Sequence, residues 1–195
     1  MDALTWGAVA VALLLAVAWY LSYSAARLDR LHTRVEGSLS ALDAQLVRRA
    51  EATLELANSG ALDPASALML VSAASESLEA HNERALEDDL LEGQVFGPRE
   101  GIESGLTEAL QAALTADVVG HLRQDPAGLA AAALERVEAA GLRVQLARRF
   151  HNDAVTDVRR VRRKQVVRVF RLAGHAELPR TVEFDDELPP AVRST

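Results

Sequence analysis

The first apolar stretch of the chain runs from Ala3 to Ala26 and contains no charged residue. A helix of this length spans about 36 Å at about 1.5 Å per residue, so it can cross a hydrocarbon layer about 30 Å thick. Aromatic side chains that favour the level of the lipid headgroups stand near both ends, as Trp6, Trp19, Tyr20 and Tyr23. The pattern predicts a transmembrane helix.

Two other structures fit an apolar N-terminal stretch, a buried core helix and a cleaved signal peptide. The stretch is too long and too uniform for the first. The second needs basic residues before the apolar region, where this chain has Asp2 and neither Lys nor Arg. We therefore predict a signal anchor over residues 1–26. Arg27, Arg30 and Arg34 follow the span, so the positive-inside rule predicts a single-pass cell-membrane protein with a short N-terminus outside and its C-terminal bulk in the cytoplasm.

Apolar residues three or four positions apart continue beyond the span and predict an all-α fold, an antiparallel bundle of about four helices over residues 27–174. The stripe of the first soluble helix is Leu28, Leu31, Val35, Leu39, Leu42, Leu46, Ala50 and Leu54. Because Gly37 alone interrupts this helix, we expect it to continue the span without a break. It should stop at Asn58-Ser59-Gly60.

A second helix is predicted to begin with Asp63 as the N-cap and Pro64 at the first helical position. Its expected buried face is Leu68, Val71, Ala74 (or Ser75) and Leu78, and that of the third helix is Ile102, Leu106, Leu110 and Leu114. Between these helices the pattern fails over residues 81–99, where acidic residues stand beside glycines and a proline. We predict an exposed acidic linker there.

The fourth helix is predicted to be the longest, from Pro126 to about Leu172. It carries a heptad-like, coiled-coil seam of Val137, Ala140, Val144, Ala147, His151, Ala154, Val158 and Val161. Leu142, Leu146 and Phe150 are expected to widen this buried face. After Gly174 the sequence turns polar and contains prolines, so residues 175–195 are predicted to form a polar tail.

Composition and motifs limit the kinds of catalytic and metal-binding site that this chain can form. The 195 residues include no cysteine, which excludes disulfides and cysteine-based catalysis or metal binding, and aromatic residues make up only 4%. The five histidines form no HExxH or ExxH pair, and the chain contains no GxSxG, GxGxxG or P-loop motif. The four-residue spacing of Asp117 and His121 is only a weak metal signal. We expect no catalytic residue, no cofactor, no metal and no small-molecule substrate.

Charge is segregated along the chain, whose formal net charge is −7. Residues 59–126 hold 13 acidic and 3 basic residues, whereas residues 127–176 hold 4 acidic and 11 basic residues. Seven cations cluster near the end of the last predicted helix: Arg159, Arg160, Arg162, Arg163, Lys164, Arg168 and Arg171.

Several interpretations fit this basic run. The run is consistent with a solvated helix end whose cations are favoured by the helix dipole, or with a surface that contacts anionic lipid. It is also consistent with ion pairing to the acidic middle region of the chain. Nucleic acid is disfavoured because the chain is acidic overall and offers few aromatic side chains for stacking.

Two stretches resemble motifs of the LemA family. The segment Leu42-Asp43-Ala44-Gln45-Leu46-Val47-Arg48-Arg49 resembles the family's I-D-V-Q-L-K-R-R, and Ala147-Arg148-Arg149-Phe150-His151-Asn152-Asp153-Ala154-Val155 resembles its A-R-x-x-Y-N-x-x-V. The matched positions are Asp43, Gln45, Leu46, Arg48, Arg49, Ala147, Arg148, Asn152 and Val155. His151 departs from the family, which has an aromatic residue there. The resemblance implies a divergent, arginine-rich member, an antiparallel helical bundle on an anchor in the bacterial inner membrane, and no catalytic residues.

These observations lead to one expected function and one alternative. We expect a membrane-anchored cytoplasmic bundle that acts as a scaffold or couples the membrane to an unidentified protein partner, without catalysis. The alternative is a surface protein that binds anionic lipid and acts in envelope maintenance.

Overall fold

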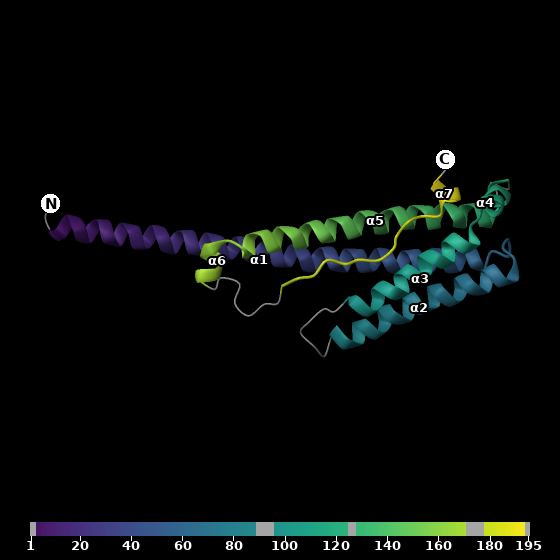
Figure 1. Cartoon of the computed structure of the whole chain (residues 1–195), viewed down its shortest axis with the longest axis horizontal. Coiled ribbons are helices and arrows are strands. Elements are labelled where there is room, and N and C mark those ends of the chain that lie inside the picture. The colour runs from purple at the N-terminus through teal and green to yellow at the C-terminus, as the bar shows by residue number, and fades with distance from the viewer. Residues whose placement is uncertain (1–2, 89–95, 125–127, 171–177, 194–195) are drawn as a thin grey trace. The chain divides into compact units, whose positions relative to one another are not determined.

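The computed structural model describes residues 3–88, 96–124, 128–170 and 178–193 (Figure 1). Within these ranges the fold is all-α and contains no strand, as the sequence predicted. The helices are α1 (Ala3–Ala57), α2 (Pro64–Asp88), α3 (Gly97–Ala113), α4 (Ala116–Arg123), α5 (Leu129–Arg162), α6 (Gln165–Val169) and α7 (Pro190–Arg193).

The chain divides into two compact units. Unit 1 combines Met1–Gly37 with Asp153–Arg180, and unit 2 combines Ser38–Asn152 with Thr181–Thr195. Helices α1 and α5 each contribute residues to both units, because the division falls at Gly37 on α1 and between Asn152 and Asp153 on α5.

Helix α1 is unbroken from Ala3 to Ala57, which confirms that the apolar stretch and the first bundle helix are continuous. Its apolar part is long and apolar enough to cross a membrane, with a mean hydropathy of 1.9, and the side chains there are exposed. A core helix of a soluble protein would bury such side chains. Among the described residues, this is the one helix that meets these criteria of length and composition.

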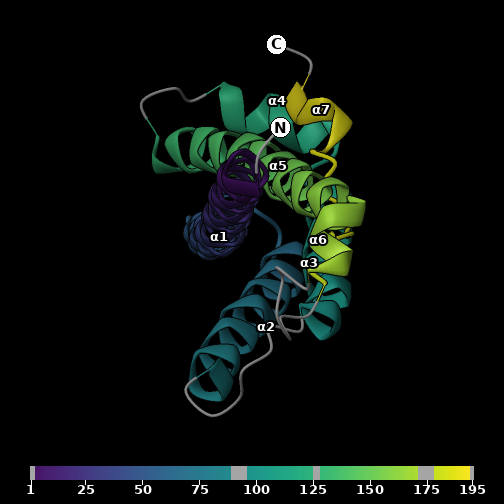
Figure 2. The same ribbon diagram turned by 90° about the vertical axis from the view of Figure 1, so that its left-hand side faces the viewer.

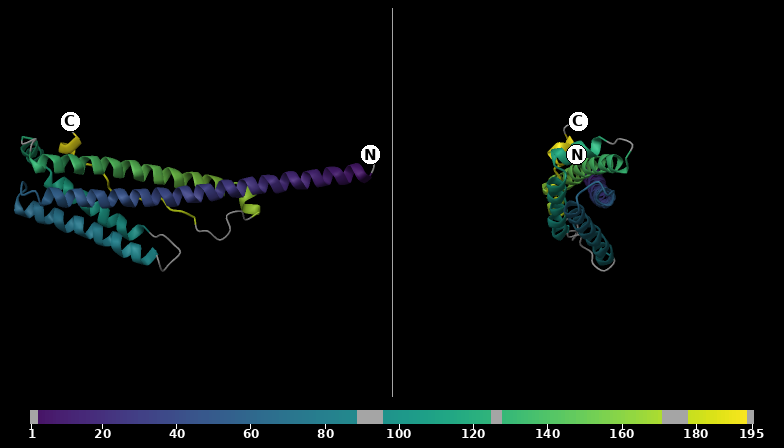
Figure 3. Two further views of the ribbon diagram at one scale, coloured as in Figure 1. Left: turned by 180° about the vertical axis from the view of Figure 1, so that it is seen from behind. Right: turned by 90° about the vertical axis from the view of Figure 1, so that its right-hand side faces the viewer.

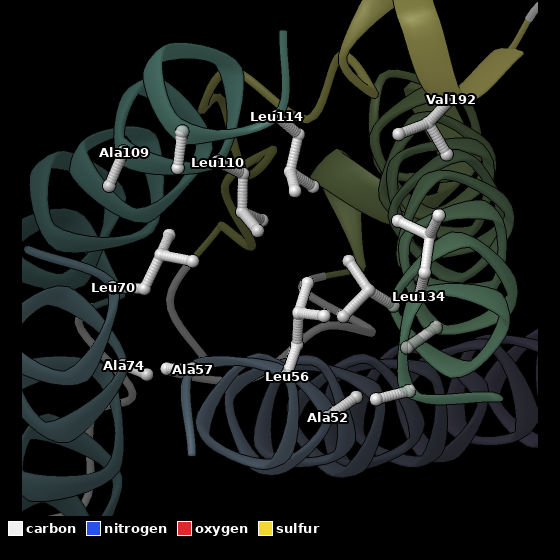
Figure 4. Close-up of a cluster of buried hydrophobic side chains, with 14 of the residues drawn as sticks. Ala52, Leu56, Ala57, Leu70, Ala74, Ala109, Leu110, Leu114, Leu134 and Val192 are labelled. Carbon is white, nitrogen blue, oxygen red and sulfur yellow. The ribbon is translucent and has the colours of Figure 1, made fainter. Parts of the chain in front are cut away.

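The main hydrophobic cluster of unit 2 draws on α1, α2, α3, α4, α5 and α7, and Figure 4 shows part of it. Leu56 on α1, Leu70 on α2, Leu110 on α3, Leu134 on α5 and Val192 on α7 converge there and are almost completely buried. Burial of a leucine side chain contributes roughly 1.5–3 kcal/mol, so this cluster supplies much of the free energy that closes the unit. Helices α2 and α3 run side by side, as Figures 2 and 3 show.

Within unit 2, α5 packs antiparallel to α1. Leu42 and Leu46 of α1 share a cluster with Val144 of α5, whereas Ala50 and Leu56, farther along α1, share one with Leu134, nearer the start of α5. The predicted burial of the seam residues on α5 is confirmed, because seven of the eight are buried and the eighth, Ala147, is half-buried.

The predicted widening of that seam is wrong. Leu142, Leu146 and Phe150 are 51–55% exposed. A helix turns by about 100° per residue, so these three residues form a row beside the seam rather than on it. The packing of α5 covers the Val144 side of the helix and leaves this row uncovered.

Helix α2 begins as predicted but buries a different face. The Asp63 carboxylate accepts the backbone N–H groups of Ala65 and Ser66, both at 3.0 Å, which caps the helix. Leu68 is 71% exposed, whereas Leu70, Ala74 and Ser77 are buried. The list of expected buried residues was therefore only partly correct, because α3 covers α2 from a direction that periodicity alone does not specify. The third predicted helix buries Leu106, Leu110 and Leu114 as expected, and Ile102 is half-buried.

The linker predicted over residues 81–99 is shorter in the structure. Helix α2 extends to Asp88 and α3 begins at Gly97, so both ends of the predicted linker are helical; residues 89–95 lie outside the described residues. Arg99 is buried rather than exposed. Its burial is possible because the carboxylates of Glu103 on α3 and Asp43 on α1 balance its charge, as described below.

The C-terminal segment differs from the predicted polar tail. Val182, Phe184, Leu188 and Val192 are buried, and we call residues 178–193 the C-terminal strap. Residues 181–193 of the strap belong to unit 2, where Val182 and Phe184 pack with Leu42 and Val144. The alternation of apolar and polar residues over 182–186 explains how an extended segment with many charges buries two large side chains.

The last long helix also ends earlier than expected. Helix α5 ends at Arg162, the chain bends at Lys164, and the five-residue α6 follows. In unit 1, Leu28 and Val35 of α1 pack with Val158 and Val161 of α5 and with Val167 of α6. This small core joins the end of α5 to the turns of α1 that directly follow the apolar stretch.

Candidate functional site

The basic run lies in unit 1, at the end of α5 and on α6. Arg159 is half-buried and its Nε donates to the carbonyl oxygen of Pro179 at 2.9 Å. Arg160 is exposed, with its Nη1 3.6 Å from the Asp157 carboxylate. Arg163, Lys164 and Arg168 are exposed, Arg162 is half-buried, and Arg171 lies outside the described residues.

Four of these cations line one hollow of about 390 Å³, which we call the arginine hollow. Its lining consists of Arg159, Arg162, Arg163, Arg168 and Leu178. The other two described cations of the run, Arg160 and Lys164, are not part of the lining. The structure therefore divides a continuous basic sequence into residues that share a concave surface and residues that do not.

The bend between α5 and α6 creates this arrangement. Arg159, Arg162 and Arg163 have the spacing of one helix face, but Arg168 is nine residues after Arg159. On an uninterrupted helix nine residues correspond to about 900°, which would place Arg168 on the opposite side. The helix instead ends at Arg162 and restarts at Gln165, with backbone hydrogen bonds from Lys164 to Val161 and from Arg168 to Lys164.

Apolar side chains accompany the arginines in unit 1. Val169 and Phe170 are 73% and 52% exposed, and Leu178 of the hollow is 50% exposed. On the α1 side, the cluster that holds this end of α5 begins at Leu28, two residues after the last residue of the uncharged stretch. Cations and exposed apolar groups thus occur together next to the end of the candidate membrane span.

A second feature is a buried ionic network in unit 2. Glu103 of α3 is completely buried, and its Oε2 accepts from Nη2 of Arg49 at 2.7 Å. Its Oε1 accepts from Arg99 Nε and from the Ser77 hydroxyl, both at 2.9 Å. Three helices therefore supply the donors that stabilise one buried carboxylate.

The network extends through Asp43, whose carboxylate pairs with Arg99 and lies 2.9 Å from Nδ1 of His81. Arg49 also donates to the Thr107 hydroxyl, and that hydroxyl lies 2.6 Å from the carbonyl oxygen of Asp185 in the C-terminal strap. Two arginines thus face two carboxylates, so the formal charges of these four groups balance. Removal of one member of such a buried set is costly, because it leaves the charge of its partner uncompensated.

The residues matched to the family motifs have separate roles in this structure. Asp43 and Arg49 belong to the ionic network, Leu46 and Val155 are buried, and Arg48 is exposed. Gln45 and Ala147 line a shallow groove of about 220 Å³ in unit 2, together with Ser38, Ala41, Arg143, Leu146 and Phe150.

Arg148 and Asn152 bind the C-terminal strap. Arg148 makes two hydrogen bonds to the Asp186 carboxylate, at 2.7 and 2.9 Å, and these bonds raise the pKa of Arg148 above its usual value. Asn152 donates to the carbonyl oxygen of Val182 at 3.0 Å and accepts from the Val182 N–H at 2.9 Å. The motif side chains therefore hold the strap in place by charge and by backbone pairing.

Sequence reasoning missed Ser77, Arg99, Glu103, Thr107 and Asp186. The spacing of Arg99 and Glu103 is that of an i, i+4 ion pair, a signal that could have drawn attention to them. Their burial depends on contacts with distant residues on α1 and α2, which no local pattern reveals.

In the described part of the chain no group of three or more potential metal ligands occurs, so Asp117 and His121 belong to no such group. His151 is buried on the seam with its Nδ1 3.0 Å from the Ser38 hydroxyl. This is the packed histidine of a helix interface.

No protein-family model, curated protein or solved structure matches the chain. The resemblance to the LemA family therefore rests on the two sequence motifs and remains a prediction.

Proposed function

We propose that this protein is a membrane-anchored scaffold that couples a bilayer to a partner protein and performs no catalysis of its own. The proposal rests on the continuity of α1. Its first part exposes a long apolar surface, and its last part supplies Leu46 and Leu56 to the core of unit 2. A continuous helix that exposes apolar side chains over its first part and contributes to a folded core over its last part is suited to hold a folded unit at a membrane.

The anchoring and its direction are tested by labelling of single cysteines in a chain that has none of its own. We propose a cell-membrane location with the N-terminus outside. A cysteine that replaces Asp2 should then react with an impermeant maleimide on intact cells, and one that replaces Ser194 should react only after lysis. The opposite labelling would overturn the orientation, and recovery of the chain in a carbonate wash would overturn the anchoring.

A row of exposed apolar side chains supports the proposal that this protein binds a partner protein. Leu142, Leu146 and Phe150 follow each other at steps of four on α5, and Leu146 and Phe150 also line the shallow groove. Contiguous exposed apolar side chains mark interaction surfaces in soluble domains. A photo-crosslinking residue at Leu146 should therefore give a discrete adduct in cells, whereas one at the exposed Glu135 of the same helix should not. Equal adducts at both positions, or none at Leu146, would contradict the scaffold function.

Binding of anionic lipid is a second candidate function, favoured by the arginine hollow in the unit that contains the apolar stretch. The full chain in a neutral detergent should bind short-chain anionic lipids better than zwitterionic ones, and salt should weaken this preference. Equal binding of both lipid classes would exclude this candidate and leave the scaffold function untouched.

A further inference from the structure

We propose that the arginine hollow is a binding site for the phosphate headgroup of a membrane lipid, and that it prefers a terminal phosphate monoester. The inference deepens the second candidate function and rests on it. It replaces a general attraction between a basic run and an anionic surface with a site made by four particular residues: Arg159, Arg162, Arg163 and Arg168.

The charge of the hollow favours an anion. Among the described residues its lining contains four guanidinium groups and no carboxylate. Like charges gathered on one concave surface repel each other, and an anion of matching charge relieves that repulsion. Arg159 is already held by the Pro179 carbonyl at 2.9 Å, so one wall of the hollow is positioned before any ligand arrives.

The type of donor favours phosphate over other anions. A guanidinium group is planar and donates two parallel N–H groups to a pair of phosphate or carboxylate oxygens. A phosphate monoester carries about −1.5 to −2 charges near pH 7 and presents three acceptor oxygens. A phosphodiester headgroup carries a single charge and has two unesterified oxygens, so it offers fewer acceptors to the exposed Arg163 and Arg168.

The apolar surroundings favour a lipid over free phosphate. Leu178 forms part of the lining, and the exposed Val169 and Phe170 directly follow Arg168. Neither feature helps to bind an inorganic ion. Together they resemble the segments that lie at the boundary between headgroups and acyl chains, where cations contact phosphate and apolar side chains contact the acyl region.

The experiment compares two double variants of the full chain in a neutral detergent. R163Q/R168Q removes two exposed arginines that line the hollow. R160Q/K164Q is the matched control, because it removes the same charge from exposed residues of the same basic run outside the lining. The probes are dihexanoyl phosphatidic acid, dihexanoyl phosphatidylglycerol and inorganic phosphate, and affinities are measured by isothermal titration calorimetry. Thermal unfolding followed by circular dichroism checks that both variants fold.

The wild-type chain should bind phosphatidic acid about tenfold more tightly than phosphatidylglycerol, and R163Q/R168Q should lose about tenfold or more of that affinity. R160Q/K164Q should lose at most about threefold, as expected for exposed charges outside the site. Inorganic phosphate should compete only weakly.

Four results would overturn the inference. Equal losses in both double variants, or equal binding of the two lipids by the wild type, would mean diffuse attraction without a site, and the second candidate function would survive. Binding of inorganic phosphate as tight as that of phosphatidic acid would mean a site for the free ion. Absence of any anionic-lipid binding would remove the inference and the second candidate function together.

Discussion

Arg49 on α1 and Glu103 on α3 lie buried against each other, with Nη2 of the guanidinium 2.7 Å from Oε2 of the carboxylate. The two residues are 54 positions apart in the chain. The contact, together with those of Glu103 to Ser77 and Arg99, ties α1, α2 and α3 into one packed group.

Removal of Glu103 should therefore destabilise unit 2 severely. Glu103→Leu leaves Arg49 and Arg99 buried without the carboxylate that they share, and breaking a buried pair from one side costs roughly 3–5 kcal/mol. The measurement is chemical unfolding of the full chain in detergent, followed by circular dichroism. Glu108→Leu, an exposed position on the same helix, is the control. A Glu103→Leu variant as stable as this control would mean that the network contributes nothing to the pairing of the helices.

The two faces of α5 should respond differently to the same substitution. Val144→Asp places a carboxylate in a completely buried position and should cost about 3 kcal/mol or more. Leu146→Asp introduces the same group two residues later at a position that is 54% exposed, and should change stability little. Thermal midpoints of the two variants test this. If both fall equally, the exposed row of α5 is covered in the folded protein.

The fit of the C-terminal strap against α5 can be tested at Gly141. A Cβ atom at this position would overlap the side chain of Leu188, so Gly141→Ala should destabilise the protein despite the better helix propensity of alanine. In a Leu188→Ala background the overlap disappears. The same Gly141→Ala change should then stabilise by about 1 kcal/mol. A double-mutant cycle measures this reversal of sign, and simple additivity of the two changes would show that the strap does not pack there.

The cap of α2 predicts a dependence on pH. Hydrogen bonding to Ser66, followed by smaller contributions that include the Ala65 N–H, lowers the pKa of Asp63 below its ordinary value. A carboxyl group whose pKa is lower in the folded state stabilises the fold above its unfolded pKa of about 3.9, and this contribution is lost as pH falls through the folded pKa. The stability gap between wild type and Asp63→Ala should therefore be present at neutral pH and shrink in acid.

Asp63→Asn provides the control for this titration. Asparagine also caps helices but does not titrate, so the gap between Asp63→Asn and Asp63→Ala should persist in acid. The measurement is thermal unfolding over a pH series. A gap between wild type and Asp63→Ala that is the same at about pH 7 and about pH 2 would contradict the cap.

The sequence alone predicted the features that depend on neighbours within a few turns. These include the all-α fold, the unbroken α1, the cap at Asp63 and the seam that contains Val144. Each is a matter of helical periodicity, capping chemistry or length, which the order of residues specifies directly. The family motifs also singled out Asp43 and Arg49, but they did not identify Arg99 and Glu103, with which these two residues pair.

Only the tertiary structure decided which apolar face of α2 is covered and which row of α5 stays exposed. It determined that the C-terminal strap packs against α1 and α5. It also decided that Glu103 completes the network and that Arg168 joins Arg159 in one hollow. The physical reason is common to all of these features. A helix turns by about 100° per residue, so a modest rotation of a neighbouring element or a single bend such as that at Lys164 changes which side chains meet. The free energy that selects one arrangement comes from contacts between residues far apart in the chain.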